Sequence, residues 1–281
     1  MKKNAYADST IRAVGQRLKH LAKHCNLDSS ELVKGFIAEK SCSNAFKESL
    51  VEAYDLYCRA HKIEWSKPFY QRYDKLPKIP SERKLDMIIS SASRKYALIL
   101  SILKELGIRP IELTWLKVRD IDLETGTVNI TSAKHCVGRT LKLKPKTLAL
   151  LKTHIHAKKL GQSHTVFKMK SGSMSENYRR IRNRLAEKLG DTSLKTIRLY
   201  DFRHFRASME YHRTKDLLYV KKLLGHKDLR TTLRYTQLLE FADEEFHSAT
   251  AQTVEEARKL IETGFEYVTE FEWVKLFRKR K

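Results

Sequence analysis

A short segment with two prolines divides the chain into a smaller and a larger part. Residues 76–81 read Leu-Pro-Lys-Ile-Pro-Ser, and both Pro77 and Pro80 lack the backbone donor that a helix interior needs. The prolines therefore predict a linker over residues 76–81. Before it, apolar residues recur at the spacing of one helix face, which predicts a small helical domain over residues 1–75. The 281-residue chain leaves room for a second domain over 82–239 and a C-terminal tail over 240–281.

The larger part alternates helical and strand patterns. Residues 83–106 predict two helices that end at Gly107, and helical spacing returns over 146–156, 175–189, 202–211 and 217–224. Between these helices, residues 118–144 predict three short strands or a pair of hairpins. In the tail, Thr253 begins a capped helix, and residues 265–268 and 273–277 predict a β-hairpin. We expect a mainly α protein with a small antiparallel β-sheet, of the α+β class.

Positive charge is concentrated in the larger part of the chain. The whole sequence has 56 lysines and arginines against 33 aspartates and glutamates, which gives a net charge of +23. Residues 81–239 hold 34 basic and 14 acidic residues, a net charge of +20, whereas residues 240–281 have a net charge of −3. A basic surface of this size binds a polyanion by releasing counterions, so we predict that DNA is the partner. No run of about eighteen apolar residues and no signal-peptide pattern occurs, which argues against a membrane.

The cysteines and histidines indicate neither a disulfide framework nor a metal site. The four cysteines are scattered without Cys-x-x-Cys spacing, which predicts free thiols in a reducing cytoplasm. His154, His156 and His164 lack cysteines or carboxylates at metal-binding spacing. We therefore expect a cytoplasmic, DNA-associated protein that needs no metal or other cofactor.

The segment over residues 223–236, Leu-Leu-Gly-His-Lys-Asp-Leu-Arg-Thr-Thr-Leu-Arg-Tyr-Thr, carries the strongest chemical signal. It places His226 nine positions before Tyr235, whose hydroxyl can attack a phosphate. Such an attack needs fixed positive charge, because the transition state gathers negative charge on the phosphate oxygens. Three basic residues upstream are candidates. Arg109 lies in Gly-Ile-Arg-Pro-Ile-Glu-Leu, Arg203 lies in Tyr-Asp-Phe-Arg-His, and Lys134 lies at the expected tip of a hairpin.

The order of these five residues resembles that of the catalytic residues in the tyrosine recombinases, the phage-integrase and Xer family. The resemblance covers about the last two thirds of the chain. Arg109 matches the family's Gly-x-Arg-x-x-Glu-Leu box, and Arg203 matches the arginine of its His-x-Leu-Arg-His box. His226 matches the Leu-Gly-His box, Tyr235 the tyrosine that follows it, and Lys134 the hairpin lysine. The basic ending Phe-Arg-Lys-Arg-Lys is similar to that of archaeal members.

One position departs from the family pattern. Tyr200 stands where the family usually has the first histidine of its second box. A histidine there could accept a proton near neutral pH, whereas a phenol with an unperturbed pKa of about 10 stays protonated and mainly donates. We expect Tyr200 to hydrogen-bond the phosphate or to position Arg203; the alternative is that its ring packs in the core beside Phe202. His204 is expected to support Arg203.

The resemblance implies a site-specific recombinase that cleaves and rejoins DNA through a 3′-phosphotyrosine, formed at Tyr235 without ATP or a metal. Arg109 and Arg203 would hold the scissile phosphate. Lys134 would protonate the leaving 5′-oxygen, and His226 would donate a hydrogen bond to the phosphate or the leaving group. The resemblance also implies a tetramer on two duplexes, with residues 1–75 clamping the DNA. Two alternatives stay open: a type IB topoisomerase-like strand-passing enzyme, and a DNA-binding protein that has lost catalysis.

The helix expected over residues 175–189 has an unusual density of arginine. A run of charge on a helix is either a solvated face or a surface that contacts phosphates, and the sequence favours neither. The candidate DNA-binding residues on this helix are Arg179, Arg180, Arg182 and Arg184.

Overall fold

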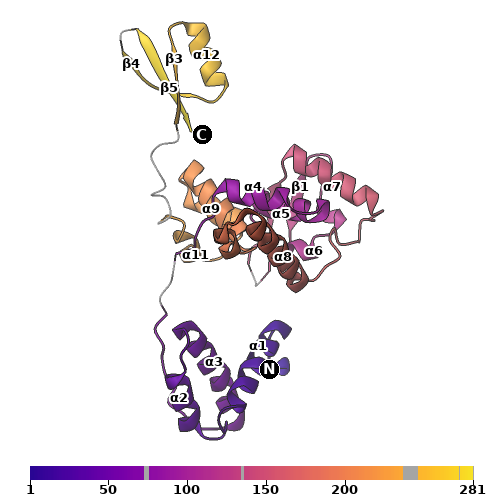
Figure 1. Cartoon of the computed structure of the whole chain (residues 1–281), viewed down its shortest axis with the longest axis vertical. Coiled ribbons are helices and arrows are strands. Elements are labelled where there is room, and N and C mark those ends of the chain that lie inside the picture. Colours follow the sequence, from indigo (N-terminus) through magenta and orange to yellow (C-terminus); the bar gives the residue numbers. More distant parts are fainter. Residues whose placement is uncertain (73–75, 134–135, 237–245, 272, 281) are drawn as a thin grey trace. The chain divides into compact units, whose positions relative to one another are not determined.

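Helices dominate the computed structural model, which describes residues 1–72, 76–133, 136–236, 246–271 and 273–280. The chain divides into two compact units, Met1–Lys75 and Leu76–Lys281. The strands form two small antiparallel sheets (Figure 1), so the expected mainly α fold with a small antiparallel sheet is confirmed. Within the described ranges, no helix is long and apolar enough to cross a membrane.

The first unit consists of three helices that follow a 3₁₀ turn at Lys2–Asn4. They are α1 (Asp8–Ala22), α2 (Ser30–Glu39) and α3 (Asn44–His61), and α3 packs against both of the others. Each helix turns one apolar face inward, because its apolar residues recur every three or four positions. The shared core consists of Leu21, Val33, Ile37, Leu50, Val51, Tyr54 and Cys58.

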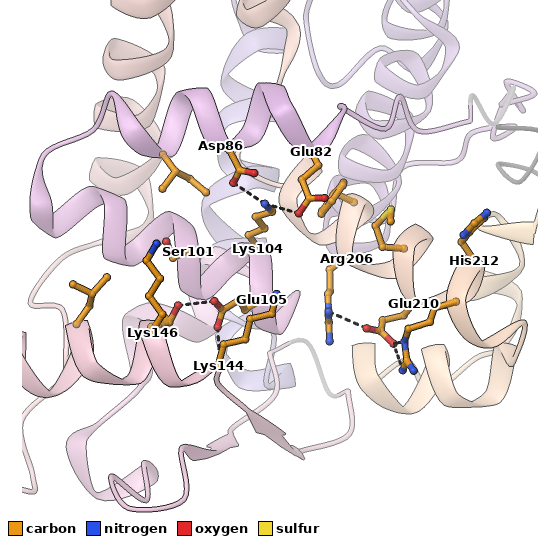
Figure 2. Close-up of a pocket in the computed structure, with 16 residues that line it drawn as sticks. Glu82, Asp86, Ser101, Lys104, Glu105, Lys144, Lys146, Arg206, Glu210 and His212 are labelled. Carbon is orange, nitrogen blue, oxygen red and sulfur yellow. Dashed lines mark hydrogen bonds and ion pairs between the residues drawn. The ribbon is translucent and has the colours of Figure 1, made fainter. Parts of the chain in front are cut away.

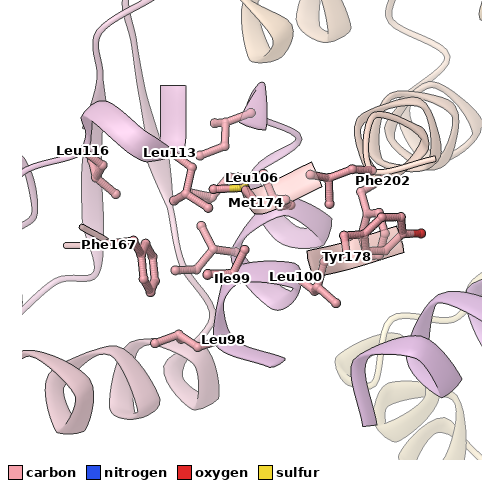
Figure 3. Close-up of a cluster of buried hydrophobic side chains, with 14 of the residues drawn as sticks. Leu98, Ile99, Leu100, Leu106, Leu113, Leu116, Phe167, Met174, Tyr178 and Phe202 are labelled. Carbon is pink, nitrogen blue, oxygen red and sulfur yellow. The ribbon is translucent and has the colours of Figure 1, made fainter. Parts of the chain in front are cut away.

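The second unit is organised around α5 (Arg94–Leu106), which contacts α4 (Glu82–Ser90), α7 (Pro145–Ala157) and α9 (Asp201–Thr214). Six apolar residues of α5 are buried, and Figure 3 labels four of them, Leu98, Ile99, Leu100 and Leu106, within the core that also contains side chains of α8 (Ser171–Leu189) and α9. The two helices expected over residues 83–106 are confirmed. Gly107 ends α5 in the left-handed conformation, with φ of +60°.

Shorter elements complete this unit. Two 3₁₀ turns, Val118–Asp120 and Thr192–Thr196, accompany three short helices: α6 (Pro110–Trp115), α10 (Leu217–Leu224) and α11 (Arg230–Leu233). The expectation of three strands or two hairpins over residues 118–144 is wrong. The described residues there form one hairpin, β1 (Thr127–Ile130) with β2 (Arg139–Lys142), and Ile121 makes only a single bridge to Val128. Residues 118–120 curl into a turn instead of extending, because the Asp120 carboxylate accepts a hydrogen bond from the Lys117 backbone.

The tail contains a second sheet, with strand order β3-β5-β4. Its elements are β3 (Phe246–Ala251), α12 (Val254–Glu262), β4 (Glu266–Phe271) and β5 (Val274–Arg280). The expected helix and hairpin are confirmed, and Thr253 caps α12 by accepting from the Glu256 backbone nitrogen. The sequence analysis missed β3. This strand is short of large apolar residues and pairs with β5, the last strand of the chain, so no local pattern reveals it.

Candidate active site

Arg109 directly precedes α6, and Pro110 occupies the first helical position, where its missing backbone N–H costs no hydrogen bond. Glu112 closes this turn, because its carboxylate accepts from the Arg109 backbone nitrogen at 2.9 Å. The same carboxylate accepts from Arg109 Nη1 at 2.7 Å and from Arg139 Nη2 at 2.8 Å. Burial opposes the charge of Glu112, but its bonds with these arginines prevail and lower its pKa to about 2. A buried carboxylate thus fixes Arg109 and ties α6 to β2.

Arg203 lies on the first turn of α9 and is almost completely buried. Its Nη1 donates to the Gly107 carbonyl at 2.8 Å, and its Nη2 donates to the Leu224 carbonyl at 2.7 Å. These bonds hold the guanidinium between the end of α5 and the end of α10. Its Nε is buried and has no partner among the described residues. Burial lowers the pKa of Arg203 to about 10, so the side chain stays charged at neutral pH.

His226 follows a turn that only glycine can form. Gly225 ends α10 with φ of +67°, and a Cβ there would lie 2.6 Å from the Val137 carbonyl oxygen. The turn brings His226 Nε2 to 3.0 Å from Arg203 Nη2 and its Nδ1 to 2.9 Å from Thr232 Oγ1. Because a guanidinium only donates, Nε2 is the accepting nitrogen here. Burial, reinforced by the charge of Arg203, lowers the pKa of His226 to about 3, so the ring is neutral.

Tyr235 lies just after α11 and is only 2 % exposed. Its hydroxyl is 3.0 Å from Nδ1 of His204, which is 6 % exposed. Burial raises the pKa of Tyr235 to about 12 and lowers that of His204 to about 4, so both groups are neutral at pH 7. The expectation that His204 supports Arg203 is wrong. His204 is the residue after Arg203 on α9, and its side chain bonds Tyr235 instead.

Tyr200 immediately precedes α9 and is 39 % exposed. The alternative that its ring packs in the core beside Phe202 is therefore wrong. The ring meets His204 edge-on, with centroids 5.1 Å apart, and borders a cavity of about 560 Å³ that Arg109 also lines. Lys134 lies outside the described residues, so its expected place beside these groups stays a prediction.

The four arginines of α8 divide between two faces of the helix. Arg179 and Arg182 line the cavity that contains Tyr200 and Arg109, whereas Arg180 and Arg184 line a separate cavity. A helix turns about 100° per residue, so neighbouring arginines cannot all face one way.

The sequence did not predict the contacts that three residues make at the site. Glu112 had a signal, because it is the acidic residue of the Gly-x-Arg-x-x-Glu box and stands three positions after the helix cap. His204 belongs to a recognised box, yet its bond to Tyr235 joins residues 31 positions apart. Arg139 had no signal: a basic residue near the expected hairpin tip reads as solvated, but its side chain is buried against Glu112.

Another cavity of the second unit, of about 610 Å³, contains many charged side chains (Figure 2). Several of these charges are paired with a neighbour of opposite sign. Lys104 pairs with Glu82 at 2.8 Å and Asp86 at 2.6 Å, and Glu210 pairs with Arg206 at 2.9 Å. The described part of the chain contains no group of three or more His, Cys, Asp or Glu side chains that could hold a metal ion.

Comparisons with known proteins find relatives that are named as recombinases. The chain is 31% identical over 159 residues to tyrosine recombinase XerA of Saccharolobus solfataricus, an alignment that covers 56% of this chain and 51% of the relative. It is 30% identical over 222 residues to a probable integrase/recombinase protein of Methanocaldococcus jannaschii, covering 75% of this chain and 66% of the relative. The chain thus spans between about half and two thirds of the length of these two relatives.

The fold has a solved counterpart in a lambda integrase tetramer bound to a Holliday junction. The TM-score is 0.60 at 14% sequence identity, with 82% of this chain and 72% of that chain covered. The profile of the phage integrase family matches residues 74–240, more than half of the chain. The chain therefore belongs to the phage integrase family, the tyrosine recombinases.

Proposed function

We propose that this protein is a site-specific DNA recombinase that cleaves and rejoins DNA through a 3′-phosphotyrosine at Tyr235. The observation that carries the proposal is the buried cluster in which Arg203 bonds His226 and Tyr235 bonds the neighbouring His204. A buried tyrosine hydroxyl beside fixed cations suits nucleophilic attack on a phosphate. The names of the two curated relatives support the same chemistry.

The scissile phosphate is held by two guanidiniums. Arg203 has a buried Nε that no described residue satisfies, and Arg109 borders the cavity beside Tyr200. A guanidinium holds its N–H donors in one plane, which suits them to phosphate oxygens. Tyr200 donates a further hydrogen bond from its exposed position. Together these donors stabilise the charge that develops on the phosphate oxygens during attack.

Cleavage joins Tyr235 Oη to the phosphorus and breaks the bond from phosphorus to the 5′-oxygen. Lys134 supplies the proton with which the 5′-oxygen leaves. His226 is neutral in the protein alone, and the negative charge of a bound phosphate raises its pKa. In the DNA complex, a phosphate oxygen replaces His226 Nε2 as the partner of Arg203 Nη2, and Nε2 takes up a proton and donates to the phosphate. Tyr235 retains the phosphodiester energy, so a 5′-hydroxyl can reverse the step without ATP.

The protein acts as a tetramer on two DNA duplexes in the cytoplasm. Exchange between two duplexes cuts four strands, and each protomer supplies one Tyr235, so four protomers complete the reaction. A lambda integrase with this fold is a tetramer on a Holliday junction, which supports this assembly. The helical unit Met1–Lys75 clamps the duplex, and residues 81–239, with their net charge of +20, bind its phosphates.

Capture of covalently attached DNA tests the proposal. The protein is incubated with genomic DNA of its source cells and denatured, and the DNA that stays attached is sequenced. We expect one enriched site with the wild type and none with Tyr235→Phe, which removes only the attacking oxygen and leaves duplex binding close to wild type. Tyr267→Phe, at an exposed tyrosine of β4, is the matched control and keeps the adduct. An adduct in Tyr235→Phe, or none in the wild type, would contradict the proposal.

A further inference from the structure

We propose that His204 is the catalytic base that takes the proton from the Tyr235 hydroxyl, in place of the histidine that Tyr200 has replaced. The inference rests on the proposed function and names a residue to which neither the family boxes nor the relatives assign this task. The inference follows from the hydrogen bond of the Tyr235 hydroxyl, which is the attacking group. Tyr235 Oη is 3.0 Å from His204 Nδ1, which is hydrogen-bond distance.

The fold holds this contact rigidly. His204 lies on the first turn of α9, and Tyr235 follows α11, so the bond joins two separate elements. Tyr235 packs with Ala207 of α9 and with Val220, Leu223 and Leu224 of α10, and both partners of the bond are more than nine-tenths buried. Water has little access to the hydroxyl. Among the described residues, His204 is the side chain whose ring nitrogen lies within hydrogen-bond distance of the Tyr235 hydroxyl.

Tyr200 is not suited to take the proton from the Tyr235 hydroxyl. A phenol has no basic nitrogen, and the Tyr200 ring meets His204 edge-on, with centroids 5.1 Å apart. A neutral imidazole always has one nitrogen that accepts. Because the Tyr235 hydroxyl must donate its proton, Nδ1 of His204 is the acceptor and Nε2 carries the hydrogen. The replacement of a histidine by Tyr200 thus moves the base by four residues, one turn along α9.

Burial and the charges around His204 keep its ring neutral in the protein without DNA. Burial lowers its pKa most, and Arg198, Arg234 and Arg203 lower it further, while Asp201 opposes them. The bound phosphate brings negative charge to the arginines and offsets their effect. The basicity of His204 therefore rises when the substrate is in place.

The step balances in both directions. In cleavage, the bond from Tyr235 Oη to phosphorus forms, the Tyr235 proton moves to His204 Nδ1, and the 5′-oxygen leaves with a proton from Lys134. In rejoining, a 5′-hydroxyl attacks the phosphotyrosine, and His204 returns its proton to the departing Tyr235 oxygen. Cleavage thus requires neutral His204, and rejoining requires the protonated ring.

Two substitutions separate a base from a hydrogen-bonding partner. His204→Ala removes the acceptor, whereas His204→Asn keeps an oxygen that can accept from Tyr235 but takes up no proton near neutral pH. The substrate is a duplex of the site found by adduct sequencing, nicked so that cleavage is irreversible. We expect both variants to cleave more slowly than wild type by a factor of about 100 or more. His212→Ala, further along α9, is the matched control and keeps the wild-type rate.

Added imidazole and the pH profile complete the test. Imidazole enters the space left in His204→Ala and restores part of the rate, but it does not accelerate His204→Asn. The wild-type rate falls as acid protonates His204, and His204→Asn lacks this decrease. Cleavage at the wild-type rate by either His204→Asn or His204→Ala, or faster cleavage by His204→Ala, would overturn the role of His204. The proposed function would still hold if wild type forms the adduct at Tyr235. Absence of an adduct in the wild type would instead remove the proposed function itself.

Discussion

Several hydrogen bonds of the site converge on the buried carboxylate of Glu112. It accepts from the side chains of Arg109 and Arg139 and from the backbone of Ala133, close to the expected hairpin lysine. A buried carboxylate in this setting stabilises the fold only while both arginines remain paired with it. Removal of one partner of a buried ion pair commonly costs about 3–5 kcal/mol, because the other charge stays buried without compensation.

Glu112→Gln should therefore lower the melting temperature at pH 7 and slow cleavage, because Arg109 loses the carboxylate that orients it. The folded-state pKa of Glu112, about 2, lies below its unfolded value of about 4.3. The stabilisation is thus complete above about pH 4.3 and is lost as pH falls towards 2. Thermal unfolding from pH 7 to pH 2 should show this loss in wild type and a smaller loss in the variant. Glu124→Gln, at an exposed turn, is the control; equal melting temperatures for Glu112→Gln and wild type would contradict the prediction.

At the scale of elements, α8 shows how one helix presents like charges to two environments. Arg179 and Arg180 are 63% and 69% exposed, and both pair with Glu176, at 3.4 and 3.3 Å. They differ mainly in the face that they occupy. Arg179 lines the cavity beside Arg109, and Arg180 lines the other cavity. If the first cavity is where the DNA backbone passes, Arg179 contacts phosphate and Arg180 does not.

Arg179→Ala should weaken duplex binding similarly for all sequences and reduce the salt slope by about one, because one phosphate contact is lost. Arg180→Ala should leave both quantities near wild type. Fluorescence anisotropy with a labelled duplex at several salt concentrations measures both. Equal losses of affinity in the two variants would contradict the prediction. They would mean that DNA contacts both faces of α8 and not only the face that borders the cavity with Arg109.

At the scale of the whole molecule, we expect charge rather than apolar surface to determine how DNA is bound. Because residues 81–239 have a net charge of +20, the logarithm of the affinity should fall linearly with the logarithm of the salt concentration. Six to ten phosphate contacts correspond to a loss of about 10³–10⁵ in affinity between about 50 and 200 mM salt. Binding titrations of the full chain on an unrelated duplex test this. Affinity that stays constant over this range would exclude phosphate contacts as the main source of binding.

The sequence by itself determined the elements and residues that have local signals. Helical spacing and its end signals predicted α10 at its observed bounds and the end of α5 at Gly107, because a helix depends on residues three and four apart. The motif boxes predicted Arg203, His226 and Tyr235 as site residues. Each box is a short continuous segment, so it can be found in the sequence without knowledge of the fold. The structure brings Arg203 and His226 into direct contact.

Only the tertiary structure decided which of these side chains meet. The bond between His204 and Tyr235 spans 31 positions, and the pair of Glu112 with Arg139 spans 27. No periodicity encodes such contacts, because they depend on how α9 packs beside α10 and how β2 lies against α6. The same holds for the exposure of Tyr200 and for the strand β3, which exists through its pairing with β5. Local sequence specifies short-range backbone geometry, whereas burial and partner choice arise only when distant elements exclude water together.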